Sequence, residues 1–247
     1  MAKVLIPIPR QDFDPTETSI PWLILSQNHH EVVFATPDGK PGVADLRMVD
    51  GRGLGPLQML KANEAARSAY SEMIKHPAFL KPKKWDECRA DDYQALLLPG
   101  GHAPGMREYL ESAVLQNLVS EFFKADKPVG AICHGVVLAA RSQIAGRSVL
   151  YGRKTTALPK WMELSAWGMT GLWLGNYYRT YSKTVEAEVV DALAKRDDFA
   201  RGPFSSKRDS ANSLDLGFSV QDRNYLSARW PGDAHAFGNS LVRMLRK

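Results

Sequence analysis

The sequence is poor in cysteine, with only Cys88 among charged residues and Cys133 after an apolar segment. Two cysteines in such different surroundings do not indicate a disulfide framework, which favours a reducing compartment, and we expect a cytoplasmic protein. Long apolar runs are also missing. The opening run is interrupted by Pro7 and Pro9 and is too short for a signal peptide. Nothing approaches the ~20 apolar residues that a transmembrane helix needs, so we expect no membrane partner.

Neither sign of charge dominates the sequence. The 32 Lys and Arg residues and the 27 Asp and Glu residues are interspersed and leave a net charge of +5. This mildly basic surface lacks the clustered stripe that is typical of nucleic-acid binding, and we expect no nucleic-acid partner. We see no repeat and no low-complexity segment. A chain of 247 residues with 44% hydrophobic residues fits one large α/β domain over residues 1–247.

Short apolar segments alternate with segments of helical character. We expect strands at Lys3–Ile8, Glu31–Ala35, Gln94–Leu98, Pro128–Ile132, Ser148–Tyr151, Leu216–Val220 and Tyr225–Ala228. Helices are expected from Pro15 to about Asn28, at 57–74, 112–124, 136 to about 144, 159–166, 185–194 and 234–245. The alternation predicts an α/β fold with a doubly wound, mostly parallel sheet, a flavodoxin-like sandwich. Residues 42–92 interrupt the alternation, and we interpret them as a small inserted cap over one sheet edge.

The segment Lys127–Arg141 (KPVGAICHGVVLAAR) carries the most specific signal. A buried strand runs into Cys133 without a turn signal and continues at once as a helix, which is the geometry of a nucleophile elbow with cysteine in place of serine. Free N–H groups and the helix dipole at this position favour a thiolate, and we therefore expect the pKa of Cys133 to lie below the usual ~8.5. The alternative is a small, inert, buried cysteine.

Glu17 lies in the first turn of the helix that follows the first strand. Carboxyl ends of parallel strands meet at one edge of a sheet, so we expect Glu17 to lie near Cys133. A partly desolvated carboxyl beside a thiolate should have a raised pKa and should be able to exchange a proton with the sulfur. The alternative is a capping box, with Glu17 at the third position behind the cap Asp14.

Three further positions fall on the same edge. Gly100 and Gly101 end another strand, where they form either an oxyanion hole or a plain turn, and His102 follows them toward the expected pocket. His134 can pair with Cys133 only through the bent backbone of an elbow and needs a third group to orient its ring, for which Glu163 is the best candidate. Alternatively, His134 only points into a cleft or toward a partner surface. We interpret the aromatic residues between 167 and 181 as core or subunit interface.

The sequence contains four motifs that together resemble those of a known family. In order along the chain they are FDPTE, LLLPGGHAPG, AICHG and SARWPGDAH. The chain resembles the ThiJ/PfpI superfamily of class I glutamine-amidotransferase-like fold, and most closely its larger branch of heat-shock chaperone and glyoxalase III-like proteins. The resemblance implies that Cys133 is the nucleophile and Glu17 its acidic partner, that His134 and Glu163 complete a Cys-His-acid set, and that Gly101 and His134 supply oxyanion N–H groups. It also implies a homodimer.

The activity implied by the resemblance is glutathione-independent conversion of a 2-oxoaldehyde such as methylglyoxal to a 2-hydroxy acid. The thiolate of Cys133 would form a hemithioacetal, Glu17 or His134 would move a proton through an enediol, and water would release the acid from a thioester. These steps require no cofactor. Some relatives bind a metal near the PGGH histidine, but we see no ligand set around His102 and predict no metal site.

The alternative functions are of two kinds. One is a cysteine-dependent amidase, hydrolase or isonitrile hydratase that uses the same site. The other is a stress chaperone or redox sensor in which Cys133 is oxidised.

Overall fold

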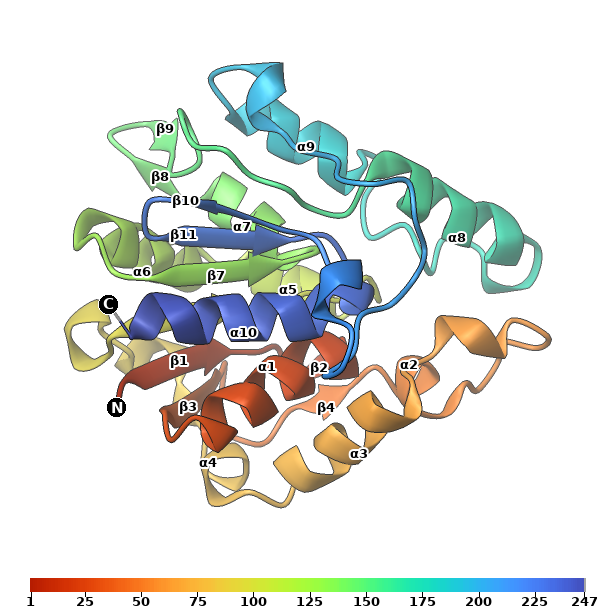
Figure 1. The fold of residues 1–247 in the computed structure, drawn as a ribbon, viewed down its shortest axis with the longest axis horizontal. Coiled ribbons are helices and arrows are strands. Elements are labelled where there is room, and N and C mark those ends of the chain that lie inside the picture. Colours follow the sequence, from red (N-terminus) through yellow and green to blue (C-terminus); the bar gives the residue numbers. More distant parts are fainter. Residues whose placement is uncertain (247) are drawn as a thin grey trace.

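The computed structural model describes residues 1–246 and centres on a seven-stranded sheet of order β10-β11-β7-β6-β1-β3-β5 (Figure 1). Its strands are β1 (Lys3–Pro7), β3 (Glu31–Thr36), β5 (Lys83–Lys84), β6 (Ala95–Leu98), β7 (Val129–Ile132), β10 (Ser219–Asp222) and β11 (Tyr225–Ala228). Neighbouring strands pair in parallel except β10, which runs antiparallel to β11. The central order β3-β1-β6-β7-β11 is the flavodoxin-like 2-1-3-4-5 order, which confirms the expected fold class.

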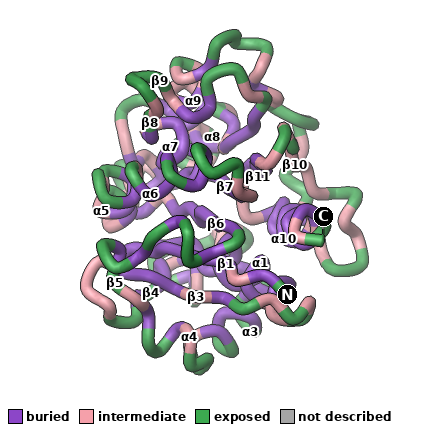
Figure 2. The backbone as a smooth tube through the Cα atoms, turned by 90° about the vertical axis from the view of Figure 1, so that its left-hand side faces the viewer, coloured by how far each residue is buried: buried purple, intermediate pink, exposed green. Residues whose placement is uncertain are grey.

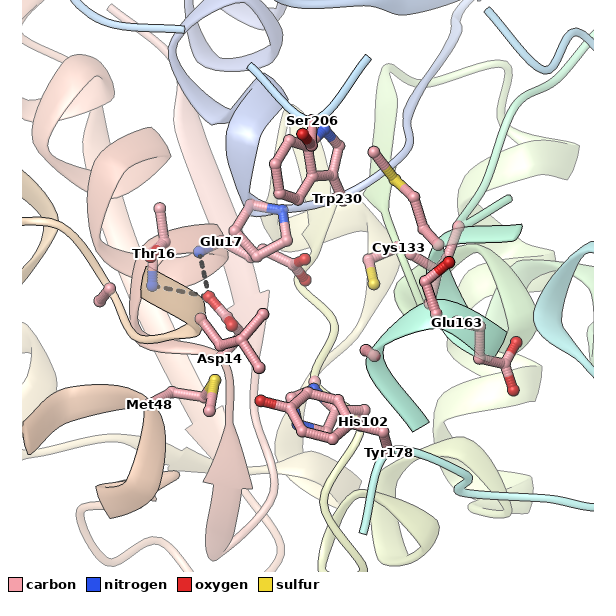
Figure 3. A pocket seen from close by; sticks show the side chains of 18 of the residues that line it. Asp14, Thr16, Glu17, Met48, His102, Cys133, Glu163, Tyr178, Ser206 and Trp230 are labelled. Carbon is pink, nitrogen blue, oxygen red and sulfur yellow. Dashed lines mark hydrogen bonds between the residues drawn. The ribbon is translucent and has the colours of Figure 1, made fainter. Parts of the chain in front are cut away.

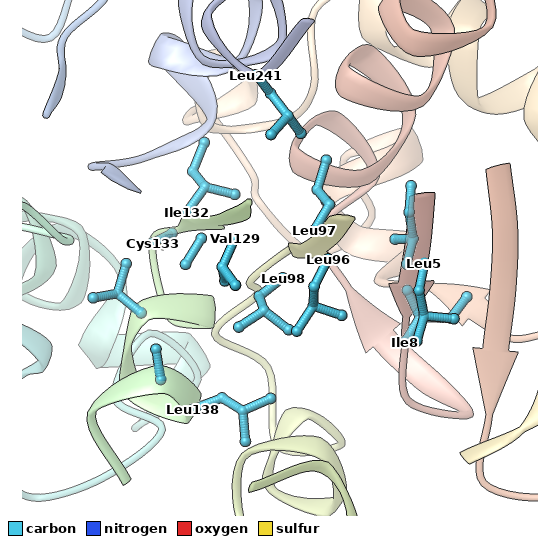
Figure 4. Close-up of a cluster of buried hydrophobic side chains, with 14 of the residues drawn as sticks. Leu5, Ile8, Leu96, Leu97, Leu98, Val129, Ile132, Cys133, Leu138 and Leu241 are labelled. Atoms are coloured by element: carbon cyan, nitrogen blue, oxygen red, sulfur yellow. The ribbon is translucent and has the colours of Figure 1, made fainter. Parts of the chain in front are cut away.

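Helices cover both faces of the sheet (Figure 1). On one face α1 (Pro15–Gln27) packs against α10 (Ala234–Leu245) and, on its outer side, against α3 (Glu64–Met73). On the other face lie α5 (Met106–Leu110), α6 (Ala113–Lys124) and α7 (Gly135–Arg141), with α9 (Val185–Ala192) beyond α7 and next to α8 (Lys160–Leu174). The central strands are therefore buried on both faces, which is why their sequences are apolar without alternation (Figures 2 and 4).

Shorter elements complete the fold. Strand β2 (Gln11–Phe13) pairs with β4 (Val43–Ala44), and β8 (Gln143–Ile144) pairs with β9 (Arg147–Ser148). The helices α2 (Leu46–Asp50) and α4 (Pro77–Leu80) belong to residues 42–92, which also contribute the outermost strand, β5. No helix formed by the described residues combines the length and the apolar character that a bilayer crossing requires.

Three of the expected elements differ most clearly from the structure. The helix expected at 57–74 is a 3-10 turn followed by α3, because the Asn63 side chain caps a new helix by accepting the N–H of Ala66. The helix expected at 159–166 starts at Lys160 and continues to Leu174, where Gly175 ends it with a φ of 56°. The strand expected at 148–151 is reduced to β9, the second strand of a small hairpin.

The sheet order determines where a ligand can bind. The chain extends the sheet from β1 toward β3 in one direction and later from β6 toward β7 in the other. Connections on the two sides of such a switch point diverge, which opens a crevice at the carboxyl ends of β1 and β6. The segments that follow β1, β6 and β7 all meet there.

Candidate active site

Cys133 has the backbone of a nucleophile elbow. It follows β7 directly, and one residue separates it from α7. Its φ of 56° is rare for a residue with a side chain. Glycine is required at position 135, because a Cβ there would lie 2.2 Å from the carbonyl oxygen of Leu98. Close packing of the turn against β6 therefore holds the sulfur at the sheet edge.

Glu17 faces the sulfur from α1 (Figure 3). Asp14 caps this helix by accepting the N–H groups of Thr16 and Glu17 at 2.8 and 3.0 Å. The Glu17 carboxylate does not return to the cap, so the capping-box alternative is wrong. Its Oε2 accepts the N–H of Gly100 at 2.9 Å, and the Gly100 carbonyl accepts the N–H of Asp14 at 2.9 Å. These two bonds tie the start of α1 to the end of β6.

The side chains of Glu17 and Cys133 are both almost entirely buried. Burial raises the pKa of Glu17 well above its usual value, and the nearby carboxylate of Asp14 adds to the shift. Burial also raises the pKa of the Cys133 thiol, and repulsion from the Glu17 carboxylate is the second cause of this rise. The expected low pKa of Cys133 is therefore wrong, while the expected rise for Glu17 is confirmed. The pair holds at least one proton at neutral pH.

His134 is oriented by a hydroxyl group. Its Nδ1 lies 3.5 Å from the sulfur of Cys133, and its Nε2 lies 3.1 Å from Oγ1 of Thr180. Thr180 donates its only hydroxyl hydrogen to the carbonyl of His102 at 2.6 Å, so it must accept from Nε2–H. This leaves Nδ1 as an acceptor toward the thiol. Burial lowers the pKa of His134 to about 3, so the ring is neutral.

Glu163 is not the group that orients His134. Its Oε2 accepts the N–H of Val185 at 2.9 Å, and its Oε1 lies 3.2 Å from Nε of Arg179. The carboxyl points away from the sulfur although the residue lines the same cavity (Figure 3). The position on α8 explains this, because Glu163 lies in the first turn and faces the start of α9. The expectation that Glu163 completes a triad therefore lacks the required geometry.

The glycine pair has two different roles. The N–H of Gly100 is occupied by Glu17, so the expected oxyanion donor is instead an anchor for the carboxyl. A Cβ at Gly100 would lie 2.7 Å from both Oε2 of Glu17 and the nitrogen of His134, which excludes larger residues. Gly101 lines the cavity, with a φ of 148°. Within residues 1–246, the N–H groups of Gly101 and His134 donate to no backbone oxygen.

His102 lines the cavity as expected but is held as a neutral ring. It stacks on Tyr178, with ring centroids 4.3 Å apart and an interplanar angle of 15°, and it meets the edge of Tyr177 at 4.8 Å. Burial lowers the pKa of His102 to about 3. Tyr178 also lines the cavity, so the aromatic segment is not only core or interface. Within residues 1–246, no cluster of His, Cys, Asp and Glu is arranged to hold a metal ion.

A cavity of about 330 Å³ opens above Cys133 and Glu17. Its walls come from three distant parts of the chain: residues 42–92, helix α8 and the segment from Ser206 to Pro231. Several lining residues were not foreseen from the sequence, namely Asp14, Met48, Trp161, Arg208 and Trp230. Trp230 belongs to the SARWPGDAH motif and could have been selected for that reason. Arg208 lies in a polar loop that carries no signal in the sequence.

The fold and the site define a flavodoxin-like α/β protein with a buried cysteine on a nucleophile elbow and a carboxyl facing it. A family model described as ThiJ/PfpI family-like matches residues 8–203. The chain therefore belongs to the ThiJ/PfpI-like family, as the motifs indicated.

Curated relatives share parts of the chain. Deglycase PfpI of Pyrococcus furiosus is 38% identical over 162 residues, which are 66% of this chain and 68% of that protein. The glutathione-independent glyoxalase hsp3102 of Schizosaccharomyces pombe is 34% identical over 149 residues, or 59% of each chain. Protein DJ-1 homolog D of Arabidopsis thaliana is 39% identical over 106 residues. The match spans only 25% of that plant protein.

Solved structures resemble the chain over nearly its full length. Glyoxalase III from Candida albicans has a TM-score of 0.69 at 18% identity, covering 98% of this chain and 96% of that one. The rapid encystment protein of Francisella tularensis has a TM-score of 0.71 at 16% identity, covering 99% of both chains. At these identities the likeness establishes the fold alone.

Proposed function

We propose that the protein is a cysteine-dependent, glutathione-independent glyoxalase-type enzyme that converts a 2-oxoaldehyde to a 2-hydroxy acid. The observation that carries this proposal is the buried Cys133–Glu17 pair, which lines an open cavity. The names of the relatives, deglycases and glyoxalases, support carbonyl chemistry at such a site. The reaction needs a nucleophile and a mobile proton, and the neighbouring thiol of Cys133 and carboxyl of Glu17 support both requirements.

In the first step the sulfur adds to the aldehyde carbon. The Cys133 proton passes to the neighbouring base, and the new carbonyl oxygen receives a proton, so a neutral hemithioacetal forms. The carbon bearing the sulfur then loses its hydrogen as a proton to Glu17 or His134 while the oxygen of the adjacent carbonyl gains a proton, which gives an enediol. The adjacent carbon then takes up a proton while the hydroxyl group on the sulfur-bearing carbon loses its own, which produces a 2-hydroxy thioester. Water then attacks the thioester, releases the 2-hydroxy acid and restores the thiol, so that the net change is addition of one water.

The surrounding groups fit these steps. Oε2 of Glu17 is held by Gly100, whereas Oε1 is bound to no other side chain or backbone group with good hydrogen-bond geometry among residues 1–246, so Oε1 is left to exchange a proton with the neighbouring Cys133. Nδ1 of His134 is an acceptor beside the sulfur. The N–H groups of Gly101 and His134 are the donors for the oxygen that develops charge, a contribution worth about 100-fold or more in rate. No step requires a redox partner.

A hydrolytic reaction on a larger glycated substrate is the second candidate. The specific observation in its favour is that the archaeal relatives are named deglycases. Both reactions would begin with the sulfur of Cys133 and differ in the group that leaves. Deglycase action would release an amine or thiol from the substrate, whereas the glyoxalase-type reaction consumes the free dicarbonyl.

The test is loss of methylglyoxal without glutathione, together with chromatographic detection of the 2-hydroxy acid. We expect turnover by the wild type and loss of at least about 1000-fold in Cys133→Ser, because serine is a far weaker nucleophile in this setting. Cys88→Ala is the matched control, since Cys88 is buried at the far side of the core beside Tyr93 and should leave turnover unchanged. Absence of 2-hydroxy acid with the wild type, under conditions where a glycated amine is cleaved, would replace this proposal by the deglycase one.

A further inference from the structure

The cavity is large for methylglyoxal. Its volume of about 330 Å³ lies in the range of pockets that enclose drug-sized ligands. Most of its wall is apolar, formed by Met48, Leu60, Ala62, Leu158, Trp161, Met162, Ala166, Met169, Trp230 and Pro231. A small, polar dicarbonyl would leave most of this surface uncovered. An apolar body on the substrate would bury it.

Among the described residues that line this cavity, Arg208 is the one lysine or arginine. Its guanidinium lies over the ring of Trp230, 5.1 Å from the centroid, and Nη2 reaches the carbonyl of Lys61 at 3.5 Å. Within residues 1–246, Nη1 is buried without a hydrogen-bond partner, and no carboxylate oxygen lies within 4.0 Å of the side chain's nitrogen atoms. Burying a cation without an ion pair lowers the stability of the folded protein. We therefore expect Arg208 to have a function that compensates for this cost.

Unsatisfied polar atoms concentrate around the same cavity. Ten buried side-chain nitrogen or oxygen atoms of the described residues have no partner, and half of them belong to residues that line it. Besides Arg208 Nη1, these include two neutral donors, Nε1 of Trp230 and the hydroxyl of Tyr178. Buried donors are normally paired, so unpaired donors that line the same cavity as a guanidinium mark a place for acceptor oxygens from a ligand. Bidentate recognition of a carboxylate is the geometry that arginine favours.

We propose that the substrate is a 2-oxoaldehyde larger than methylglyoxal, with an apolar body and a carboxylate that is bound by Arg208. This inference rests on the proposed function and adds a substrate class to it. The dicarbonyl end meets Cys133 at the floor of the cavity, the apolar body lies against α8 and residues 42–92, and the carboxylate meets the guanidinium beside Trp230. The competing explanation is that Arg208 only balances the charge of Asp14 and Glu17, which it also attracts.

The experiment compares initial rates on phenylglyoxal and para-carboxyphenylglyoxal, with arginine modification excluded by intact mass. For the wild type we expect a kcat/KM that is on the order of 10- to 100-fold higher on the carboxylated aldehyde, the range of a charge-assisted hydrogen-bonded pair. In Arg208→Met this preference should vanish, mainly through KM. Lys207→Met, which removes the adjacent but exposed cation, should retain it. If Arg208 only balances charge, both substrates lose rate equally and the pH profile of kcat shifts.

A binding measurement separates this inference from the proposed function. We expect calorimetry on Cys133→Ser to show tighter binding of para-carboxymandelate than of mandelate, and loss of that difference in Cys133→Ser/Arg208→Met. Equal binding of the two acids would overturn the inference even if the enzyme turns over methylglyoxal. Conversely, a preference in binding without turnover of any dicarbonyl would overturn the proposed function and leave the carboxylate site in place.

Discussion

The pKa of Cys133 shows which of two opposing effects dominates at this site. The dipole and free N–H groups at the start of a short helix favour a thiolate by about 0.3–1 kcal/mol in exposed settings. Enclosing an ion costs several kcal/mol, and a neighbouring acid adds repulsion. Burial raises the pKa of Cys133 with the N–H of His134 as the lesser, opposing influence. The positions of Cys133 and Glu17 in the sequence predicted correctly that the sulfur and the carboxyl meet at one sheet edge. How deeply the two groups are buried depends on the cavity walls, which form only in the folded protein.

Thr180 is a positioning residue for His134, a role for which its sequence context gives no signal. Thr180→Val removes the acceptor for Nε2–H while keeping the shape of the side chain. We expect kcat to fall on the order of 10-fold or more, because the ring loses the tautomer that leaves Nδ1 facing the sulfur. Thr180→Ser keeps the hydroxyl and should restore most of kcat. Steady-state kinetics of the two variants provide the measurement.

Thermal unfolding of the same variants separates positioning from folding. If Thr180→Val and Thr180→Ser lose equal rate, or if the loss in Thr180→Val follows its loss of stability alone, the hydroxyl does not orient the ring.

At the scale of elements, the turn between β7 and α7 depends on the absence of a side chain at Gly135. In Gly135→Ala the new Cβ would lie 2.2 Å from a backbone oxygen of β6, so the elbow must move or the strands must separate. We expect the free energy of unfolding to fall by at least about 2 kcal/mol, as for overpacked cores, measured by denaturant titration.

Gly168→Ala provides a control that should change the free energy of unfolding in the opposite direction. Gly168 lies inside α8, and nothing lies within 4 Å of a Cβ built there. Alanine should therefore stabilise the helix by about 0.4–1 kcal/mol. Equal effects of the two substitutions would show that the elbow is not tightly packed.

The elements differ in how well their sequences predicted them. Helix α10 matches its expected bounds, and α1 begins at the Asp-Pro signal, because local caps and periodicity decide both. Helix α8 extends well past its expected end, because its apolar and aromatic residues contain no strong breaker before Gly175. Residues 42–92 interrupt the alternation of strands and helices, and the sequence did not indicate β5, because its place at the sheet edge depends on pairing with β3.

At the scale of the molecule, the alternation of strands and helices was sufficient to predict the sheet and its ligand-binding edge. It therefore brought Glu17, Gly101, His102 and Cys133 to one place. The cavity itself could not be predicted, because Met48, Met169 and Arg208 meet only through tertiary packing of segments far apart in the sequence. The homodimer and the cytoplasmic location stay predictions.

The coupling of Cys133 to Glu17 is tested most directly by the pH dependence of alkylation of Cys133 with iodoacetamide, followed by peptide mass spectrometry. Because the Glu17 carboxylate raises the pKa of Cys133, the wild-type rate should rise in two steps as the two groups titrate. Glu17→Gln should give one step, at lower pH than the upper wild-type step, because the repelling carboxylate is gone. Glu163→Gln, whose carboxyl points away, should keep the wild-type profile. A single step at the same pH in wild type and Glu17→Gln would contradict the coupling.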